Sequence, residues 1–535
     1  MNVPVVWINY NPDRPAGPEP YWDNAIVDWL LSEAWVPGMP TFTYHWTFDG
    51  LYASEGVVVV TPGHYGSEGI ARLNQAIEVH PWALIIITSD EEGAFPAWEI
   101  EHPNVRVWKQ HPSTRVKWWP DVALPLGWRP GTREHFAGEP TPRKSVDWAF
   151  MGQGGKHRQD VVDALGGMPE GSGWLQVTDG FAKGIDQKTY LDHLADAKVA
   201  PCPPGPNTPD TFRLYEALEA GCLPVVDEAT YDYLSSYPLF GLVTRDSWTG
   251  GVQFALELCS RQTSLAGYYL LELKRRLACQ LRDDIEHLSQ TDRYWSDTDQ
   301  ITVLVSTSPS ILHPDTTIID ETIQSIRERL PRSEILIMCD GVRPEQQDLT
   351  DPYLEYLRRV VWRSMHHWDN VYPIVMGEFV HKAEATRRTL PMVHTPLVLF
   401  VEHDTPLVGE IPFDRLAQIV SKENMVIRLH HEAAVHPEHE HLNVSGLIRR
   451  KDVWLQPTVQ WSQRPHLAQT DKYRKMIADF FTPESRTFIE DKMHGVVHHG
   501  KWATWKVALY HPEGDIKRST HTDGRAGQPK YEVKF

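Results

Sequence analysis

The sequence predicts an α/β protein with two Rossmann-like domains, a helical connector and a third α/β domain. Three observations lead to this prediction. Short apolar runs alternate with helical patterns, and each run is continuously hydrophobic, which is typical of strands buried on both faces of a parallel sheet. A chain of 535 residues is too long for one hydrophobic core. A Pro/Gly-rich passage and a purely helical stretch divide the pattern into three parts.

Residues 1–140 are expected to form the first Rossmann-like domain. Its strands are predicted at residues 3–10, 56–63, 83–90 and 104–111, and its helices at 21–34 and 67–81. The run ALPLGWRPGTREHFAGEPTPRKS (123–145) follows, and its Pro and Gly content is typical of a linker between domains.

Residues 141–251 are expected to form the second Rossmann-like domain, because residues 146–167 have the pattern of a strand, a Gly-rich turn and a helix. The connector, 252–299, is helical. Its apolar residues recur at three- and four-residue steps and predict one buried helix face, which either closes the first two domains or links them to the rest. They are Leu270, Leu273, Leu277, Leu281, Ile285 and Leu288.

Residues 300–535 are expected to form the third α/β domain. Strands are predicted in QITVLVSTSPS (300–310), EILIMCDG (334–341) and TPLVLFVEHDTPL (395–407), with a helix in TTIIDETIQSIRERLP (316–331). From about residue 410 the chain is rich in His and Trp and is less periodic. Within it, HHEAAVHPEHEH (430–441) does not have the H-E-x-x-H spacing of zinc proteases, and we interpret it as a polar loop.

The composition excludes several classes of protein. A net charge of −19 argues against a surface that binds nucleic acid through its phosphates. The sequence has no leader pattern and no run of 18 apolar residues, so we expect a cytoplasmic protein without a membrane segment. Five scattered cysteines indicate reduced thiols and no disulfide framework.

The Gly-rich turn MGQGGKHR (151–158) follows a predicted strand and opens a helix, so its backbone N–H groups predict an anion site. Lys156 and Arg158 carry the charge that suits a phosphate. The spacing matches neither the dinucleotide fingerprint nor the P-loop. The alternative is an ordinary strand-to-helix turn with solvated charges.

A second loop-to-helix entry lies in PCPPGPNTPDTFRLYEALEAGCLPVV (201–226). Asp210 or Thr211 caps the predicted helix, Arg213 falls in its first turn, and Glu216 comes three residues later on the same side. A cation at a helix N-terminus suits a diphosphate, and a carboxylate accepts hydrogen bonds from a ribose diol. The alternative is a surface ion pair between Arg213 and Glu216.

Residues 146–228 resemble the donor-binding half of exostosin-like glycosyltransferases, which have the GT-B fold. The resemblance depends on the Gly turn with its following Arg and on the run DTFRLYEALEAGCLPVV. It implies that Glu216 holds the nucleotide ribose, that Arg213 holds the diphosphate, and that the glycines approach the sugar-phosphate. These glycines are Gly152, Gly154 and Gly155. It also implies that no metal is needed here and that residues 1–140 supply the acceptor site and a base, with Asp90, Glu91, Glu92 and His64 as candidates.

In the third domain, VLFVEHDTPL places Glu402 and Asp404 two residues apart at the end of a buried strand. Two close carboxylates repel unless a cation joins them, and oxygen ligands suit Mg²⁺ or Mn²⁺. The pair resembles the Asp-x-Asp motif of GT-A glycosyltransferases, with Glu in the first place. Ser306 in VSTSPS and Asp340 in MCDG resemble the nucleotide-binding positions of that sheet.

SRTFIEDKMHG (485–495) resembles the acidic pair that precedes the base-bearing helix in such enzymes, which makes Glu490 and Asp491 candidates for the catalytic base. A late histidine often completes the metal site of that fold. The sequence does not choose among the four available histidines, of which His499 is taken with Asp404 as the metal pair. They are His498, His499, His511 and His521.

Together, these resemblances imply a tandem glycosyltransferase, with a GT-B-like module (1–250) and a GT-A-like module (300–535). Each module would transfer a hexose or pentose from a nucleoside-diphosphate-sugar such as a UDP-sugar to a hydroxyl of a glycan, a protein or a modified macromolecule. Mn²⁺ or Mg²⁺ is expected in the second module only. The alternatives are a phage-type enzyme acting on hydroxymethylated DNA bases, and a sugar- or nucleotide-binding protein with a decayed catalytic site.

Overall fold

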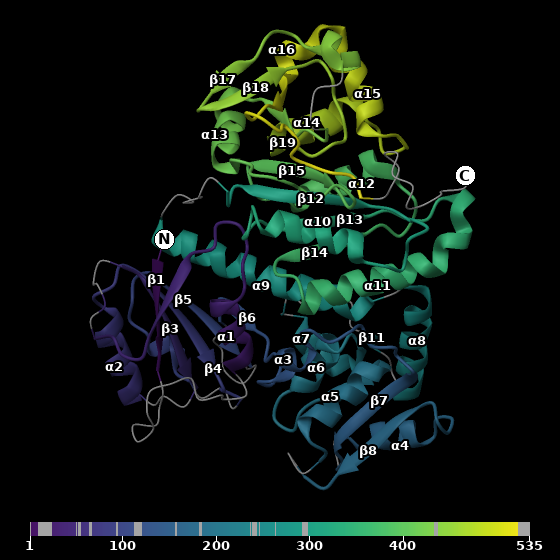
Figure 1. Cartoon of the computed structure of the whole chain (residues 1–535). Coiled ribbons are helices and arrows are strands. Elements are labelled where there is room, and N and C mark those ends of the chain that lie inside the picture. Colours follow the sequence, from purple (N-terminus) through teal and green to yellow (C-terminus); the bar gives the residue numbers. More distant parts are fainter. Residues whose placement is uncertain are drawn as a thin grey trace. The chain divides into compact units, whose positions relative to one another are not determined.

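The computed structural model divides into two compact units, residues 1–294 with 365–367 and residues 295–364 with 368–535 (Figure 1). The structure describes residues 2–8, 24–49, 51, 55–63, 67–91, 95–111, 120–155, 158–180, 184–235, 237, 243–244, 247–262, 264–290, 298–432 and 437–522. None of the helices within these ranges is long and apolar enough to cross a membrane.

The first unit begins with a parallel sheet in the order β2-β1-β3-β4-β5-β6 (Figure 1). Its strands are β1 (Asn2–Trp7), β2 (Thr41–His45), β3 (Val57–Pro62), β4 (Ala83–Thr88), β5 (Val105–Gln110) and β6 (Val122–Leu124). The helices of this part are α1 (Ala25–Ser32), α2 (Ser67–Ile77) and α3 (Thr132–Phe136). β4 is buried at every position, as its continuous apolar run predicts, and α2 packs its apolar side against one face of the sheet.

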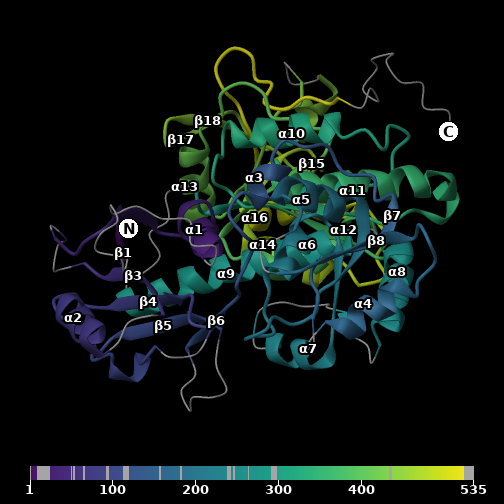
Figure 2. The ribbon, with the colours of Figure 1, turned by 90° about the horizontal axis from the view of Figure 1, so that it is seen from below.

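A second parallel sheet follows in the same unit, in the order β11-β10-β9-β7-β8. Figure 2 labels β7 and β8 of this sheet. Its strands are β7 (Val146–Gln153), β8 (Gly173–Thr178), β9 (Ala197–Pro201), β10 (Leu223–Val226) and β11 (Val243–Thr244). Its helices are α4 (Gln159–Gly166), α5 (Gln187–Asp196), α6 (Phe212–Glu219), α7 (Glu228–Leu234) and α8 (Trp248–Arg261). α4 and α8 cover one face, while α5 and α6 pack against the sheet from β7 to β10.

The predicted connector is part of the first unit. The apolar stripe of α9 (Leu265–Ser289) is buried at all six predicted positions, and the helix packs against α6, β10 and β5. The Trp108 indole of β5 donates a 2.8 Å hydrogen bond to Asp284 Oδ2 of α9. Of the two roles that the sequence left open for this helix, the structure supports closure of the first two sheets.

The second unit contains one mixed sheet in the order β14-β13-β12-β15-β19-β16-β20-β18-β17 (Figure 1). Its strands are β12 (Ile301–Thr307), β13 (Ile335–Cys339), β14 (Val371–Val375), β15 (Leu397–Glu402), β16 (Val426–Arg428), β17 (Ile448–Arg450), β18 (Val453–Pro457), β19 (His466–Gln469) and β20 (Val507–Tyr510). β12 to β15 pair in parallel, and β19 runs antiparallel to both β15 and β16. β15 and β16 therefore end at the same edge of the sheet.

Helices cover both faces of this sheet and give it two hydrophobic cores. One core contains the apolar sides of α10 (Thr317–Arg327), α11 (Thr350–His366) and α13 (Phe413–Glu423). The other contains those of α12 (His381–Thr389), α14 (Thr470–Phe480) and α15 (Ile489–Val496). Successive residues of a strand enter opposite cores, as Val303 and Leu304 of β12 do, so both strand faces must be apolar.

Candidate functional site

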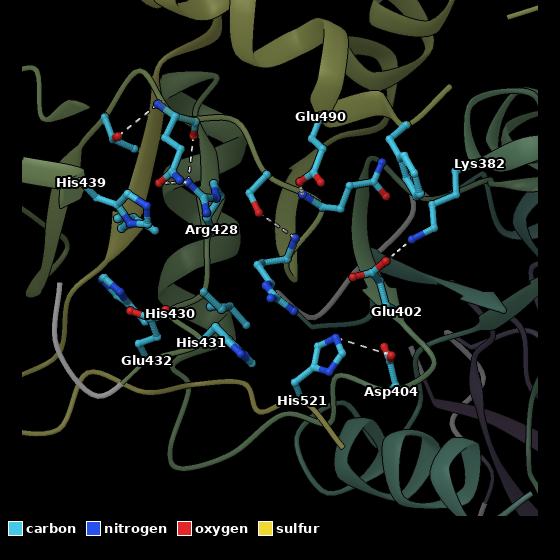
Figure 3. A pocket seen from close by; sticks show the side chains of 18 of the residues that line it. Lys382, Glu402, Asp404, Arg428, His430, His431, Glu432, His439, Glu490 and His521 are labelled. Atoms are coloured by element: carbon cyan, nitrogen blue, oxygen red, sulfur yellow. Dashed lines mark hydrogen bonds and ion pairs between the residues drawn. The ribbon is translucent and has the colours of Figure 1, made fainter. Parts of the chain in front are cut away.

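The second unit has a polar pocket of about 440 Å³ at the edge of the sheet where β15 and β16 end (Figure 3). Three residues singled out from the sequence, Glu402, Asp404 and Glu490, line it together. The pocket is lined by Lys382, Glu402, Asp404, Arg428, Leu429, His430, His431, Glu432, His439, Asn443, Thr458, Gln460, Ser462, Gln463, Arg464, Phe488, Glu490, Leu509 and His521.

Glu402 is the last residue of β15, and a tight turn brings Asp404 to the same pocket. The Thr405 N–H donates to Glu402 O at 3.0 Å, and the Glu402 N–H donates to Thr405 Oγ1 at 3.1 Å. The Glu402 carboxylate forms an ion pair with Lys382 of α12. Burial alone would raise the pKa of Glu402, but Lys382, with help from Arg464, holds it below its usual value. Glu402 is therefore ionised and already partly neutralised.

Asp404 lies beside a histidine from the end of the described chain. Asp404 Oδ2 is 3.5 Å from His521 Nε2. The segment that carries His521 is held by backbone bonds, because Thr520 donates to Pro406 O and Thr522 donates to Asp404 O, each at 3.0 Å. The structure thus brings His521 to Asp404, whereas His499, the predicted metal ligand, is exposed in η6 (Val497–Lys501) and does not line the pocket.

A carboxylate and an imidazole at this distance suit a divalent cation of the Mn²⁺ class. Within the described ranges, no group of three or more His, Cys, Asp or Glu side chains is placed to hold a metal ion. The residues present therefore fit a cation that takes its remaining ligands from a bound diphosphate and from water, as Mg²⁺ commonly does.

The segment 430–441, interpreted from the sequence as a polar loop, contributes His430, His431, Glu432 and His439 to the pocket wall. Burial lowers the pKa of His430 to about 3, with the neighbouring His511 and Arg428 adding to the effect. Burial and Arg464 lower the pKa of His431 to about 4. Both imidazoles are therefore neutral at neutral pH, and the segment belongs to the site.

Glu490 lies in the first turn of α15, and its Oε2 accepts a 2.8 Å hydrogen bond from the Gln463 backbone N–H. This bond fixes the carboxylate at the pocket. Asp491, the other base candidate, is exposed and does not line the pocket, and Thr487 Oγ1 lies 3.5 Å from its Oδ2. The helical turn between them explains the difference, because neighbouring residues of a helix point about 100° apart.

Ser306 and Asp340 are not among the lining residues. The buried Asp340 carboxylate accepts backbone N–H groups of Gly341 and Val380 at 2.8 Å and of His381 at 3.1 Å. Burial raises its pKa, and these backbone bonds oppose the rise. Asp340 therefore fixes the start of α12, the helix that carries Lys382.

The first unit has a second pocket, of about 400 Å³, which is lined by residues of the second sheet and its loops and by loop residues that follow β4 and β6. Three predicted donor residues, Gly152, Arg158 and Arg213, are among them. The lining residues are Glu91, Leu126, Arg129, Met151, Gly152, Gln153, Arg158, Gln176, Thr178, Gly180, Gly184, Ile185, Tyr190, Gly205, Pro206, Asn207, Thr208, Asp210, Thr211, Phe212 and Arg213.

The two predicted guanidiniums of this pocket are held by carbonyl groups. Arg213 Nη2 donates to Met151 O at 2.8 Å, and Arg158 Nε and Nη2 donate to Pro204 O at 3.2 and 3.1 Å. Neither side chain forms an ion pair with a carboxylate of the described residues. Burial, and then the neighbouring Arg213, lowers the pKa of Arg158 to about 10. Two adjacent cations without an acidic partner in the described part of the chain make this pocket suited to an anion.

Gly152 makes room for Arg213. A Cβ at position 152 would lie 2.1 Å from Arg213 Nη2, so any larger residue would displace the guanidinium. Gly154 and Gly155 do not line the pocket. Gly155 has a φ of +114°, a conformation that favours glycine, and serves the turn itself.

Among the described residues, Glu216 pairs with Arg129, and Arg213 and Glu216 do not form the surface ion pair that the sequence left open as an alternative. Glu216 is 2% exposed, and its Oε1 accepts a 2.5 Å hydrogen bond from Arg129 Nε. Arg129 lines the pocket, whereas Glu216 does not. Spacing along α6 did not reveal Arg129, which lies 87 residues earlier in the chain than Glu216.

Asp90, the predicted base of the first unit, is 3% exposed and forms an ion pair with Lys109 Nζ at 2.8 Å. It does not line the pocket, but its neighbour Glu91 does, and Glu91 Oε2 accepts a hydrogen bond from Asn207 Nδ2 at 2.9 Å. The candidate base of this pocket is therefore Glu91. His64, Glu92 and Lys156 lie outside the described residues.

No known family model and no curated protein matches this chain. Among solved structures, it is similar to TarS of S. aureus (13% identity, TM-score 0.27), covering 42% of this chain and 36% of that one. It is similar to the mannosyltransferase PcManGT of Pyrobaculum calidifontis in complex with GDP-Man and Mn²⁺ (12%, 0.30, covering 43% and 58%). It is also similar to GalNAc-T7 with UDP, GalNAc and Mn²⁺ (9%, 0.28, covering 42% and 43%). The chain spans less than two thirds of the length of each of these three proteins.

Proposed function

We propose that the second unit is a metal-dependent glycosyltransferase of the GT-A type that uses a nucleoside-diphosphate-sugar. The observation that carries this proposal is the meeting of Glu402, Asp404 and Glu490 with His521 in one pocket, because these residues come from three distant segments of the chain. Asp404 and His521 would hold Mn²⁺ or Mg²⁺. The bound ion would neutralise charge on the leaving diphosphate.

The residues of the chain have separate roles in this proposal. Glu490 would take the proton from the acceptor hydroxyl, since a carboxylate fixed by the Gln463 N–H is a suitable general base. Lys382 would remain paired with Glu402 and place a fixed positive charge near the donor. The neutral His430 and His431 would offer ring nitrogens to donor or acceptor hydroxyls without adding charge.

Donor hydrolysis without an acceptor tests the proposal. The full chain is incubated with a panel of UDP- and GDP-sugars, with and without MnCl₂, and free sugar is measured. We expect slow hydrolysis of one donor that stops when a chelator is added. Saturable donor binding without turnover would instead identify a binding protein with a decayed site.

We also propose that the first unit is a GT-B-type module with a second donor site, in which Arg158 and Arg213 hold the diphosphate without a metal. The adjacent guanidiniums without a carboxylate partner among the described residues support it. Arg129, oriented by Glu216, would contact the nucleotide, and Glu91 would act as base. Nucleotide binding that persists in excess chelator would support this site, and its complete loss would contradict it.

The rival acceptor is a hydroxymethylated base in DNA. It predicts turnover with hydroxymethylated oligonucleotides, falling steeply with salt because phosphate contacts dominate such binding. The same assay with a protein or glycan acceptor separates the two cases.

A further inference from the structure

The second-unit pocket has polar groups that the proposed donor and metal roles do not use. Arg428, at the end of β16, is 6% exposed and lines the pocket. Its Nη1 donates to Gln460 O at 2.9 Å and to Gln460 Oε1 at 3.2 Å, but its Nε is buried without a hydrogen-bond partner. The guanidinium has no ion pair with a carboxylate of the described residues.

Gln463 has a similar arrangement. Its side chain lines the pocket, the residue is 4% exposed, and neither Oε1 nor Nε2 has a hydrogen-bond partner. Its backbone N–H is the group that donates to Glu490. A buried amide and a buried guanidinium without partners cost free energy unless a ligand satisfies them.

Arg428 lies apart from the residues assigned to the donor. In Figure 3, Arg428 lies on one side, Lys382, Glu402 and Asp404 lie on the other, and Glu490 projects from above between them. Arg464 adds a second guanidinium to the same pocket, and its charge acts on both Arg428 and Glu402.

We propose that the part of the pocket around Glu490 and Arg428 is an acceptor subsite for an acidic sugar. The reacting hydroxyl binds at Glu490, and a neighbouring hydroxyl binds the Gln463 amide. A carboxylate or phosphate on the sugar binds Arg428 and Arg464. The inference rests on the proposed glycosyltransferase function and names its acceptor class. A guanidinium binds such oxyanions through paired N–H groups. The Glu490 carboxylate offsets part of the Arg428 charge without an ion pair, and a neutral sugar would add no further counterion.

The step itself is a simple transfer. The acceptor oxygen forms a bond to the donor's anomeric carbon, the bond from that carbon to the diphosphate breaks, and the nucleoside diphosphate leaves with the electron pair. Glu490 takes the hydroxyl proton. The acidic group of the acceptor stays unchanged and serves only for recognition.

The test measures binding of sodium glucuronate, glucose 6-phosphate and glucose to the full chain by titration calorimetry at one ionic strength. We expect at least one of the anionic sugars to bind at least tenfold more tightly than glucose. In R428Q and R464Q this preference should fall to threefold or less. R449Q is the control, because Arg449 is an exposed arginine of β17 that pairs with Asp452 outside the pocket.

Two results would overturn the inference: equal binding of glucose and both anionic sugars, or an anion preference that survives in both R428Q and R464Q. A 20-nucleotide single-stranded DNA that displaces glucuronate at lower concentration than any sugar anion would also overturn it, in favour of a phosphodiester backbone. If R428Q does not fold, R464Q gives the result.

Binding of UDP with MnCl₂ is measured in the same samples and separates this inference from the proposed function. D404N should lose the Mn²⁺-dependent part of UDP binding and keep the anion preference. Loss of the anion preference in R464Q with Mn²⁺-dependent UDP binding intact would support the subsite. Wild-type protein that prefers the anionic sugars and does not bind UDP would contradict the glycosyltransferase proposal and not the anion site.

Discussion

The two pockets of this chain lie in similar places and have opposite chemistry. Each lies at the carboxyl edge of a sheet, after β7 in the first unit and after β15 in the second, where α/β sheets commonly bind ligands. The first presents Arg158 and Arg213 without a paired acid among the described residues, and the second presents Glu402, Asp404 and Glu490 with His521. Similar topology therefore gives the two pockets similar positions, while their side chains give them different charges.

A diphosphate leaving group can be stabilised by fixed cations or by a metal ion, and the proposed functions assign one of these means to each pocket. The first has its positive charge built into the chain. The second has carboxylates as well as cationic side chains in its lining, and under the proposal Asp404 with His521 would add a bound cation. A chelator should therefore affect ligand binding in the second pocket and not in the first.

The largest effect is expected at Asp404. Asp404→Asn keeps the size of the side chain but removes the charge that a divalent cation needs, so Mn²⁺-dependent donor turnover should fall by roughly 10³-fold, about 4 kcal/mol in barrier height. The measurement is donor hydrolysis at saturating MnCl₂. Asp414→Asn is the control, since Asp414 is exposed on α13 and lies outside the pocket. Equal turnover in both variants would remove the metal role from Asp404.

The next effect is expected at Glu490. Glu490→Gln can still accept the Gln463 N–H but cannot take a proton, so kcat for transfer should fall by roughly 10²-fold or more while donor affinity stays unchanged. Asp491→Asn is a close control, because that residue is adjacent and exposed. Steady-state kinetics with a working acceptor give both constants. A larger loss in D491N than in E490Q would reverse the assignment.

For the first unit, the corresponding prediction concerns nucleotide binding by Arg213. Arg213→Gln should weaken nucleotide binding to that unit by roughly 10- to 100-fold, the loss of one charge-assisted contact of about 1.5–3 kcal/mol. Binding is measured in excess chelator, which removes the metal-dependent share. Arg261→Gln, an exposed arginine of α8, should bind as the wild type does. If R213Q binds nucleotide normally, the paired-guanidinium site is wrong.

Much of the fold follows from local pattern. The predicted strands at 3–10, 56–63, 83–90 and 104–111 correspond to β1, β3, β4 and β5, because their apolar runs are buried on both faces. β2 (Thr41–His45), an edge strand with partly exposed residues, was not predicted. The strands after residue 410 were also missed, since several are only three or four residues long and pair with distant partners.

The site was predictable only where a motif is local. Glu402 and Asp404 were found because they lie two residues apart at the end of an apolar strand. The partners of Glu216 and Asp90, which are Arg129 and Lys109, were not visible in the spacing of the sequence, because they come from other parts of the chain. The sequence also could not show which late histidine lies beside Asp404. That depends on how residues 519–522 pair with the turn after β15, which are far apart in the sequence.

The smallest expected effect is the pH dependence of stability, which has opposite signs at two buried groups. Burial lowers the pKa of His466 in the second unit to about 4, below the unfolded value near 6.5. The unfolded state then binds more protons, so stability falls as pH drops below about 6.5. Burial raises the pKa of Asp210 in the first unit to about 7, above its unfolded value. The stability that Asp210 contributes is present in acid and is lost as pH rises through about 7.

Hydrogen exchange of peptides from β19 and α6 measures the two units separately between pH 7.5 and 5.5, after correction for intrinsic rates. In the wild type, His466 should lower the free energy of opening of β19 by about 1 kcal/mol as the pH falls from 7.5 to 5.5. His466→Gln should remove this part of the pH dependence. Asp210→Asn should raise the stability of α6 more at pH 7.5 than at pH 5.5, because Asn can accept the Leu126 N–H without a charge to bury. If each variant keeps the wild-type pH dependence of its own unit, neither buried group titrates on unfolding as the structure implies, and the opposite signs would have to come from other residues.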